Sequence, residues 1–168
     1  MMALGPIVAA SWKVPDSLAT RLVAAGRPVP APVVGFMLID TGARSNCISI
    51  EAATDLGLTP VFQEDTYGAH GKQKTPIFEA GLVFSITDSY GNRTEVRSEQ
   101  RVLGVPDMQK LFDALQVKVG GNVPPRLIGL IGRDFLRHAT LIYRGTKGSF
   151  EVVLDLTSIA PPPAPVAP

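Results

Sequence analysis

The amino-acid sequence predicts a mainly β protein, either a barrel or a sandwich, with a few short helices. Short runs of apolar and β-branched residues recur along the chain, turn-forming residues separate them, and the helical patterns between them are short. The 168 residues suit one domain, and a hydrophobic content of 45% is enough for one core. We divide the chain into an N-terminal arm or extra segment (1–29), a main domain (30–157) and a proline- and alanine-rich tail expected to be disordered (158–168).

The N-terminal segment is punctuated by prolines and carries one helical pattern. Asp16 to Ala25 predicts a short amphipathic helix, with Asp16 as the candidate N-cap and Gly26 as the stop. The segment as a whole could be a removable pro-segment, an arm across a dimer or part of the sheet. The sequence leaves these three alternatives open.

The main domain is expected to consist of strands separated by tight turns. Val33–Ile39 is apolar and β-branched, which predicts a buried strand, and Phe78–Thr87 alternates as a half-buried strand does. A polar, glycine-containing stretch at Thr66–Pro76 predicts a hairpin. The other expected elements are strands at Asn46–Ile50, Thr94–Leu103, Leu127–Ile131, Leu141–Tyr143 and Phe150–Leu156, and helices at Glu51–Gly57, Pro106–Val117 and Asp134–His138.

Composition excludes several classes of function. Charged residues make up 18% of the chain and the formal net charge is +1, so we expect no nucleic-acid partner. No apolar run approaches the roughly 20 residues of a membrane helix, so we expect no membrane partner. One cysteine, Cys47, and two histidines predict neither an internal disulfide nor a zinc site. We therefore expect no metal, no cofactor and a cytoplasmic location.

The most informative stretch runs from Phe36 to Ala43. Asp40 follows a predicted buried strand at a turn that Gly42 permits, and the Gly42 N–H is free to point at the Asp40 carboxylate. Thr41 carries a hydroxyl that needs a partner if it is buried. Such a turn can hold a carboxylate in apolar surroundings, where its pKa can be tuned. Because Asp-Thr-Gly is also ordinary turn chemistry, the functional hypothesis depends on its placement after the strand.

A second motif lies towards the C-terminus, where an apolar strand broken by glycine leads into a charged helix start, Leu127–Leu136. The chain resembles the retropepsin-like aspartic peptidases in the order of three features, which are Asp40–Ala43, a glycine-containing hairpin and Leu130–Gly132. This family comprises the retroviral proteases and their cellular and bacterial relatives. The resemblance covers about residues 30–157, and it implies a dimeric, closed β-barrel of the acid-protease type with short helices.

The resemblance implies a role for each matching residue. Asp40 would be the catalytic carboxylate, Thr41 would reach across a two-fold axis to lock two active-site loops together, and Gly42 would line the substrate site. Ala43 would complete the active-site loop. The supporting strand would consist of Leu130, Ile131 and Gly132, and the flap that closes over bound peptide would contain Tyr67, Gly68, Ala69, His70 and Gly71.

One residue departs from the pattern of this family. Retroviral members usually carry an acidic residue directly after Asp-Thr-Gly-Ala, and it pairs with the arginine of their Gly-Arg motif. Here Arg44 occupies that position, and it cannot pair with Arg133. A pair between Arg44 and Asp134 is our hypothesis for how the charge is balanced, which makes all three residues candidates for structural ion pairs.

An aspartic peptidase needs two carboxylates that share one proton, because like charges about 3 Å apart do not both ionise easily. The chain has one Asp-Thr-Gly and is too short for two lobes, so the second Asp40 would come from a second copy. The prediction is a homodimeric aspartic endopeptidase that acts on polypeptides, with Phe150–Leu156 as part of the interface. The alternatives are a catalytically silent retropepsin-like module for peptide binding or dimerisation, and a β-barrel with an incidental turn.

Overall fold

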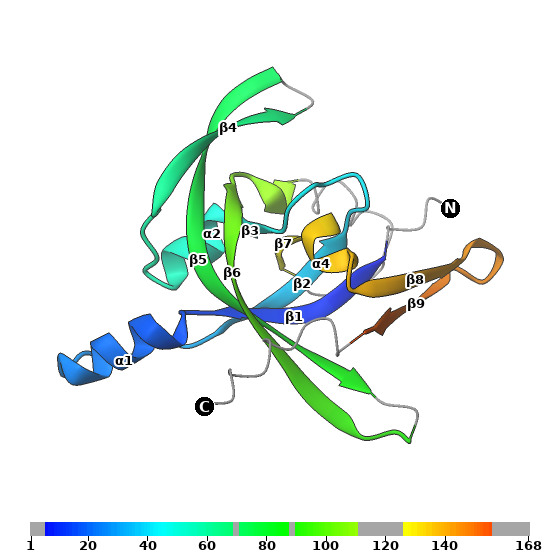
Figure 1. Cartoon of the computed structure of the whole chain (residues 1–168), viewed down its shortest axis with the longest axis horizontal. Helices are drawn as coiled ribbons and strands as arrows, with labels where there is room; N and C mark the ends of the chain where they lie inside the picture. Colours follow the sequence, from blue (N-terminus) through cyan, green and yellow to red (C-terminus); the bar gives the residue numbers. More distant parts are fainter. Residues whose placement is uncertain (1–5, 69–70, 88–89, 111–125, 156–168) are drawn as a thin grey trace, which may run out of the picture.

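The computed structural model describes residues 6–68, 71–87, 90–110 and 126–155, and within these ranges the fold is mainly β (Figure 1). Six described strands close into a barrel, in the order β1 (Ile7–Lys13), β2 (Val33–Ile39), β7 (Leu127–Ile131), β3 (Cys47–Ser49), β6 (Arg93–Val105) and β5 (Gly71–Thr87). The ring closes because β1 pairs with β2 on one side and with β5 on the other. The predicted mainly β fold is confirmed, and the barrel, not the sandwich, is the form it takes.

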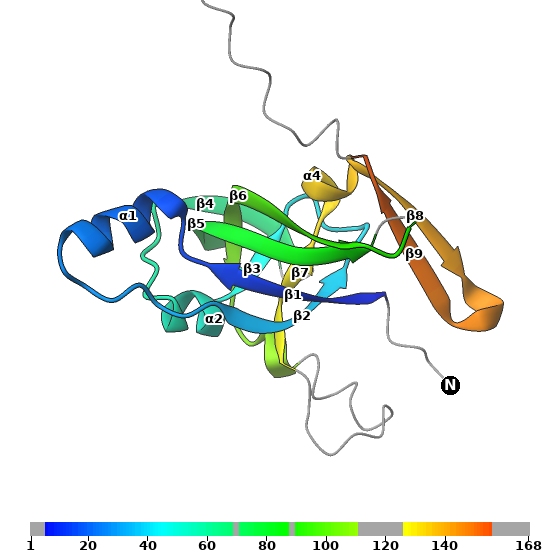
Figure 2. The same cartoon turned by 90° about the horizontal axis from the view of Figure 1, so that it is seen from below.

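The remaining elements lie outside this ring. They are β4 (Phe62–Gly68), the two-stranded sheet of β8 (Ala139–Arg144) and β9 (Ser149–Leu154), the short helices α1 (Asp16–Ala24), α2 (Ile50–Asp55) and α4 (Arg133–Leu136), and the 3-10 turn η1 (Gly145–Lys147). Figures 1 and 2 both show α1 and the β8–β9 hairpin at opposite ends of the molecule. The β4–β5 hairpin rises from one end of the barrel in Figure 1.

Strand β7 occupies the place between β2 and β3, although it comes much later in the chain. It runs parallel to β2, with Ile39 opposite Ile131, and antiparallel to β3, with Cys47 opposite Leu130. The loop from β2 to β3 therefore has to pass around the end of β7. This crossing brings the Asp40 loop and the Leu130–Gly132 motif together.

Strand β1 belongs to the barrel itself. Ile7 to Trp12 pair with β2, and Ser11 to Lys13 pair with β5, so this strand closes the ring. Trp12 is completely buried, and its Nε1 donates a hydrogen bond to the Ile128 carbonyl oxygen at 3.1 Å. The barrel therefore begins at β1 and not at residue 30. Of the three alternatives for segment 1–29, the structure shows part of the sheet for the residues of β1.

The core fills the inside of the barrel with alternating side chains from its strands. Val33, Met37 and Ile39 of β2 are buried, as their period of two in a strand requires. Ile128 and Ile131 of β7 join the same cluster, which Phe135 of α4 extends. Each Å² of apolar surface removed from water stabilises the fold by about 25 cal/mol. This buried cluster is therefore the main source of stability.

Most local elements lie where the sequence predicts them. Helix α1 forms as expected, although Pro15 and not Asp16 is its N-cap, and the Asp16 carboxylate instead pairs with Lys13 Nζ at 2.5 Å. Gly26 follows the helix with φ of 67°, the left-handed conformation that ends many helices. Strand β5 is longer than predicted, because the second arm of the hairpin continues without a break into the next strand.

Several predictions fall outside the described residues. Most of the helix expected at Pro106–Val117 lies beyond residue 110, and the tail at 158–168 and the hairpin residues Ala69 and His70 lie outside as well. Within the described ranges, no helix combines the length and apolar character needed to cross a membrane.

Candidate active site

Asp40 lies directly after β2, at the end of the barrel where β7 also ends. Its backbone N–H donates to the Ile131 carbonyl oxygen at 3.0 Å, which fixes the first residue of the turn. Its Oδ1 accepts hydrogen bonds from the backbone N–H groups of Gly42 at 2.9 Å and Ala43 at 3.2 Å. The expected contact between Gly42 and the carboxylate is thus present, and the carboxylate is held in one orientation. Thr41 is exposed at the tip of this turn.

Gly132 passes directly beneath the loop that carries Asp40. A Cβ at this position would lie 2.4 Å from the Ser45 carbonyl oxygen, so only glycine fits against this backbone. The next two residues run alongside the loop, with Arg133 N–H donating to the Ala43 carbonyl oxygen and Asp134 N–H to that of Arg44, both at 3.0 Å. These bonds fasten the two sequence motifs to each other.

Asn46 is a site residue that the sequence analysis did not single out. It is completely buried, and its side-chain oxygen accepts a hydrogen bond from Gly132 N–H at 2.7 Å. Its Nδ2 donates to Gln100 Oε1 at 2.6 Å, and its backbone N–H contacts both carboxylate oxygens of Asp134 at 3.0 Å. A polar residue between a turn and a short apolar strand was the available signal, because a buried amide needs partners.

The hypothesis that Arg44 forms an ion pair with Asp134 is wrong. Among the described ion pairs none joins these two residues. The Asp134 carboxylate instead accepts hydrogen bonds from backbone N–H groups, those of Asn46 and Phe135, the latter at 2.8 Å. The Asp134 carboxylate therefore accepts hydrogen bonds from backbone N–H groups at the start of α4. The side chains of Arg44 and Arg133 are exposed.

A cleft of about 800 Å³ opens in front of Asp40. The Asp40 loop forms its floor and the β4–β5 hairpin forms the opposite wall. Tyr67 contributes to this wall and is 79% exposed, and Gly68 and Gly71 are the last paired residues of the hairpin. The side chains and backbone that line the cleft are those of Asp40, Gly42, Ala43, Arg44, Ser45, Cys47, Glu64, Asp65, Thr66, Tyr67, Gln73, Thr75, Leu103, Val105 and Arg133.

Cys47 lines the cleft, but its environment does not favour a nucleophilic thiolate. Its side chain is 5% exposed, and burial, together with the negative charges of Asp134 and Asp40, raises the pKa of the thiol to about 12. A thiol in this environment stays neutral at physiological pH. The free energy of unfolding is therefore lowered as pH rises from the ordinary thiol pKa of 9.0 towards 12, because only the unfolded thiol ionises there.

We expect iodoacetamide at pH 8 to modify Cys47 in the folded protein about 10³-fold more slowly than in urea, since three pKa units separate the thiol from its ordinary value. Mass spectrometry reports the reaction without ambiguity, because the chain has a single cysteine. Equal rates in the folded and unfolded protein would mean that the thiolate is accessible at this site.

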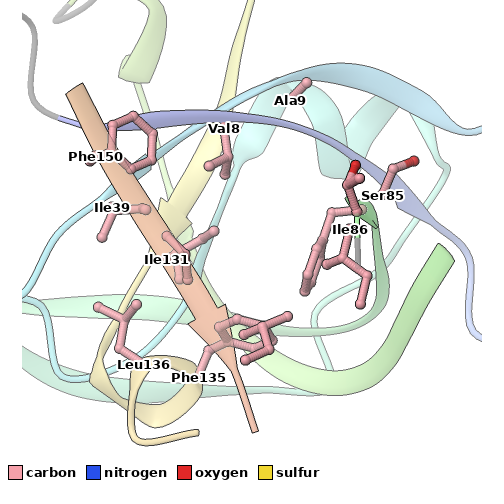
Figure 3. Close-up of a pocket in the computed structure, with 13 residues that line it drawn as sticks. Val8, Ala9, Ile39, Ser85, Ile86, Ile131, Phe135, Leu136 and Phe150 are labelled. Carbon is pink, nitrogen blue, oxygen red and sulfur yellow. The ribbon is translucent and has the colours of Figure 1, made fainter. Parts of the chain in front are cut away.

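A second, smaller hollow of about 240 Å³ lies behind the Asp40 loop, between the barrel and β9. Figure 3 shows side chains from the barrel strands, α4 and β9 gathered around it, with Ile39 and Ile131 among them. These two residues directly precede Asp40 and Gly132 in the chain. The lining is almost entirely apolar and carries no carboxylate, so it offers packing and no chemistry.

Among the described residues, no group of three or more His, Cys, Asp or Glu side chains is placed to hold a metal ion. Hydrogen-bond donors instead converge on one oxygen of a single carboxylate that borders an open cleft. Comparison with known proteins adds no further identification, since neither a family model nor a curated protein matches this chain.

Proposed function

We propose that the protein is a retropepsin-like aspartic endopeptidase, which hydrolyses peptide bonds with water activated by the Asp40 carboxylates of a homodimer. The observation that carries this proposal is the geometry of Asp40. Two backbone N–H groups hold its Oδ1 at the end of a barrel strand, and the residue borders a cleft of about 800 Å³. A preorganised carboxylate of this kind is what general acid–base hydrolysis needs.

The second carboxylate of the pair is proposed to come from another copy of the chain. Within the described lining of the cleft, the other acidic residues are Glu64 and Asp65, which belong to the overhanging hairpin. Asp65 pairs with Lys72 Nζ at 2.9 Å, so it is already neutralised. A two-fold axis near Asp40 would bring its symmetry mate beside it, and the exposed Thr41 would lie between the two loops.

The proposed mechanism assigns the two Asp40 side chains different protonation states. The ionised member takes a proton from a water molecule, and the protonated member donates towards the oxygen of the scissile carbonyl group. Water attacks the carbonyl carbon directly, so no acyl-enzyme forms. The carboxyl group that took the water proton then gives it to the amide nitrogen as the C–N bond breaks, which releases the amine and the new carboxyl product. The N–H groups of Gly42 and Ala43 keep Oδ1 oriented, which leaves Oδ2 for the water and the shared proton.

The β8–β9 hairpin is the proposed contact between the two copies. Within the described residues, β9 pairs only with β8, so its other edge is free to pair with a further strand. Val153 of β9 and Ile142 of β8 are 55% and 37% exposed, and the strand register places both on the face opposite to Phe150 and Val152, which line the apolar hollow. An apolar face beside a free edge suits association between copies.

Peptide cleavage tests the function. The purified protein is incubated with a proteome-derived peptide mixture between pH 4 and 8, and the products are identified by mass spectrometry. We expect internal cleavage sites, with the highest rates where one of two coupled carboxylates is protonated. A folded dimer that binds peptides in this mixture and cuts none would favour the silent binding module.

We expect specific activity to rise with protein concentration, because a monomer would lack the second Asp40. Sedimentation and activity measured over the same dilution series should follow one dissociation constant. Val153→Asp should shift both curves to concentrations about tenfold higher or more, since it places a charge in the proposed interface. Val23→Asp changes an exposed valine on α1, outside the proposed interface, and should shift neither. Undiminished activity at concentrations where the protein sediments as a monomer contradicts the paired mechanism.

A further inference from the structure

Two arginines line the Asp40 cleft from adjacent segments of the chain. Arg44 follows Ala43 at the end of the Asp40 loop, and Arg133 is the first residue of α4. Two backbone hydrogen bonds of 3.0 Å join these segments. Arg133 N–H donates to the Ala43 carbonyl oxygen, and Asp134 N–H donates to the Arg44 carbonyl oxygen. The backbone of the site therefore holds the two segments that carry these arginines next to each other.

Neither arginine has an ion-pair partner among the described residues. The ion pairs among the described residues use other arginines and lysines, and none includes Arg44 or Arg133. Asp134, which follows Arg133 in the sequence, accepts hydrogen bonds from backbone N–H groups. An anion that enters the cleft would give these guanidinium groups the partner that the described residues do not provide.

We propose that Arg44 and Arg133 bind a carboxylate of the substrate, so that the peptidase selects polypeptides with an acidic group beside the scissile bond. This inference rests on the proposed function, because it assigns specificity to the same cleft. Guanidinium groups present planar, paired donors that match the two oxygens of a carboxylate, and they stay charged at every relevant pH. The carboxylate could belong to an internal Asp or Glu side chain or to the C-terminus of the peptide.

The opposite wall of the cleft carries the opposite charge. Glu64 and Asp65 line the cleft from the β4 side, and only Asp65 has a described ion-pair partner. A peptide bound in an extended conformation turns successive side chains to opposite faces. The acidic group is therefore expected to face the arginine floor, and the side chains next to it, facing Glu64, should be neutral or basic.

The test uses a random octapeptide library with equal amounts of Glu and Gln, and of Asp and Asn, synthesised in free-acid and C-terminal amide forms. Wild-type protein is assayed for cleavage, and immobilised Asp40→Asn protein for retention of the same peptides. Arg44→Gln, Arg133→Gln and Arg44→Glu are compared with Arg27→Gln, which changes an exposed arginine outside the cleft. Circular dichroism checks that each variant is folded.

We expect wild type to prefer Glu over Gln about tenfold or more at one position, and Arg27→Gln to keep this preference. Arg44→Gln and Arg133→Gln should each reduce it several-fold, and Arg44→Glu should turn it towards Lys. A preference confined to free-acid peptides would assign the carboxylate to the C-terminus, and one shared by the amide peptides would assign it to a side chain.

Failure of this inference and failure of the proposed function give different results. Cleavage without an acidic preference, or with a preference that survives Arg44→Gln and Arg133→Gln, overturns the arginine assignment and leaves the peptidase. Retention of acidic peptides that depends on Arg44, with no cleavage by wild type, supports the arginine assignment and contradicts the peptidase. The absence of both cleavage and retention overturns both.

Discussion

Asp40→Asn is expected to lower peptide cleavage on the order of 10³-fold or more, while the protein stays folded. The amide can neither ionise nor share a proton with its symmetry mate, so neither the base nor the acid of the pair remains. Its oxygen can still accept the hydrogen bonds from Gly42 and Ala43, which preserves the turn. Initial rates of peptide cleavage at the pH optimum of wild type measure the loss, and thermal unfolding measures the stability.

Asp55→Asn provides the matched control for this substitution. Asp55 ends α2, is exposed and pairs with Arg126 outside the described lining of the cleft. Its change should leave the cleavage rate within about twofold of wild type, because an exposed ion pair contributes little. Full activity in Asp40→Asn would mean that another group performs the hydrolysis, and the proposed mechanism would then be wrong.

Gly132→Ala is expected to lower the free energy of unfolding by about 3 kcal/mol and to abolish cleavage at the same time. The added methyl group would lie 2.4 Å from the Ser45 carbonyl oxygen and 2.5 Å from the Ser45 carbonyl carbon. Both are backbone atoms, so no side chain can rotate to make room. The strain must move the Asp40 loop away from β7, and with it the carboxylate.

Gly145→Ala separates this effect from the general cost of adding a methyl group. A Cβ at Gly145 would meet only the Tyr143 ring, at an ordinary contact distance of 3.5 Å. Urea titration of both variants should show a reduced midpoint for Gly132→Ala and a midpoint near that of wild type for Gly145→Ala. Equal stability of the two variants would show that the loop above Gly132 yields without cost.

The sequence predicted those parts of the site that depend on neighbouring residues. Asp40 follows a buried strand, and its oxygen accepts from Gly42, because the strand and the turn are both encoded within one short stretch. The β4–β5 hairpin was predicted for the same reason, from glycines between two extended segments. Periodicity and turn chemistry act over a few residues, so they can be interpreted without knowledge of the fold.

The parts that were missed or wrong depend on residues far apart in the chain. Strand β1 closes the barrel through pairing with β5, which no local pattern reveals. Asn46 contacts Gly132 and Gln100, and Asp134 contacts the N–H of Asn46 and not the guanidinium of Arg44. Charge complementarity alone predicted the ion pair, but a carboxylate at a helix start is equally well satisfied by backbone N–H groups.

The position of β7 between β2 and β3 has a consequence for the order of folding. Local hairpins such as β4–β5 and β5–β6 can form early, whereas β7 must find strands that precede it by long stretches of chain. Closing such long loops costs conformational entropy before any contact compensates for it. The Asp40 turn packs against the segment at Gly132, which follows β7, so the site is completed only after β7 has paired. Trp12, the single tryptophan, donates a hydrogen bond to Ile128 of β7, so its fluorescence should report when β7 joins the barrel.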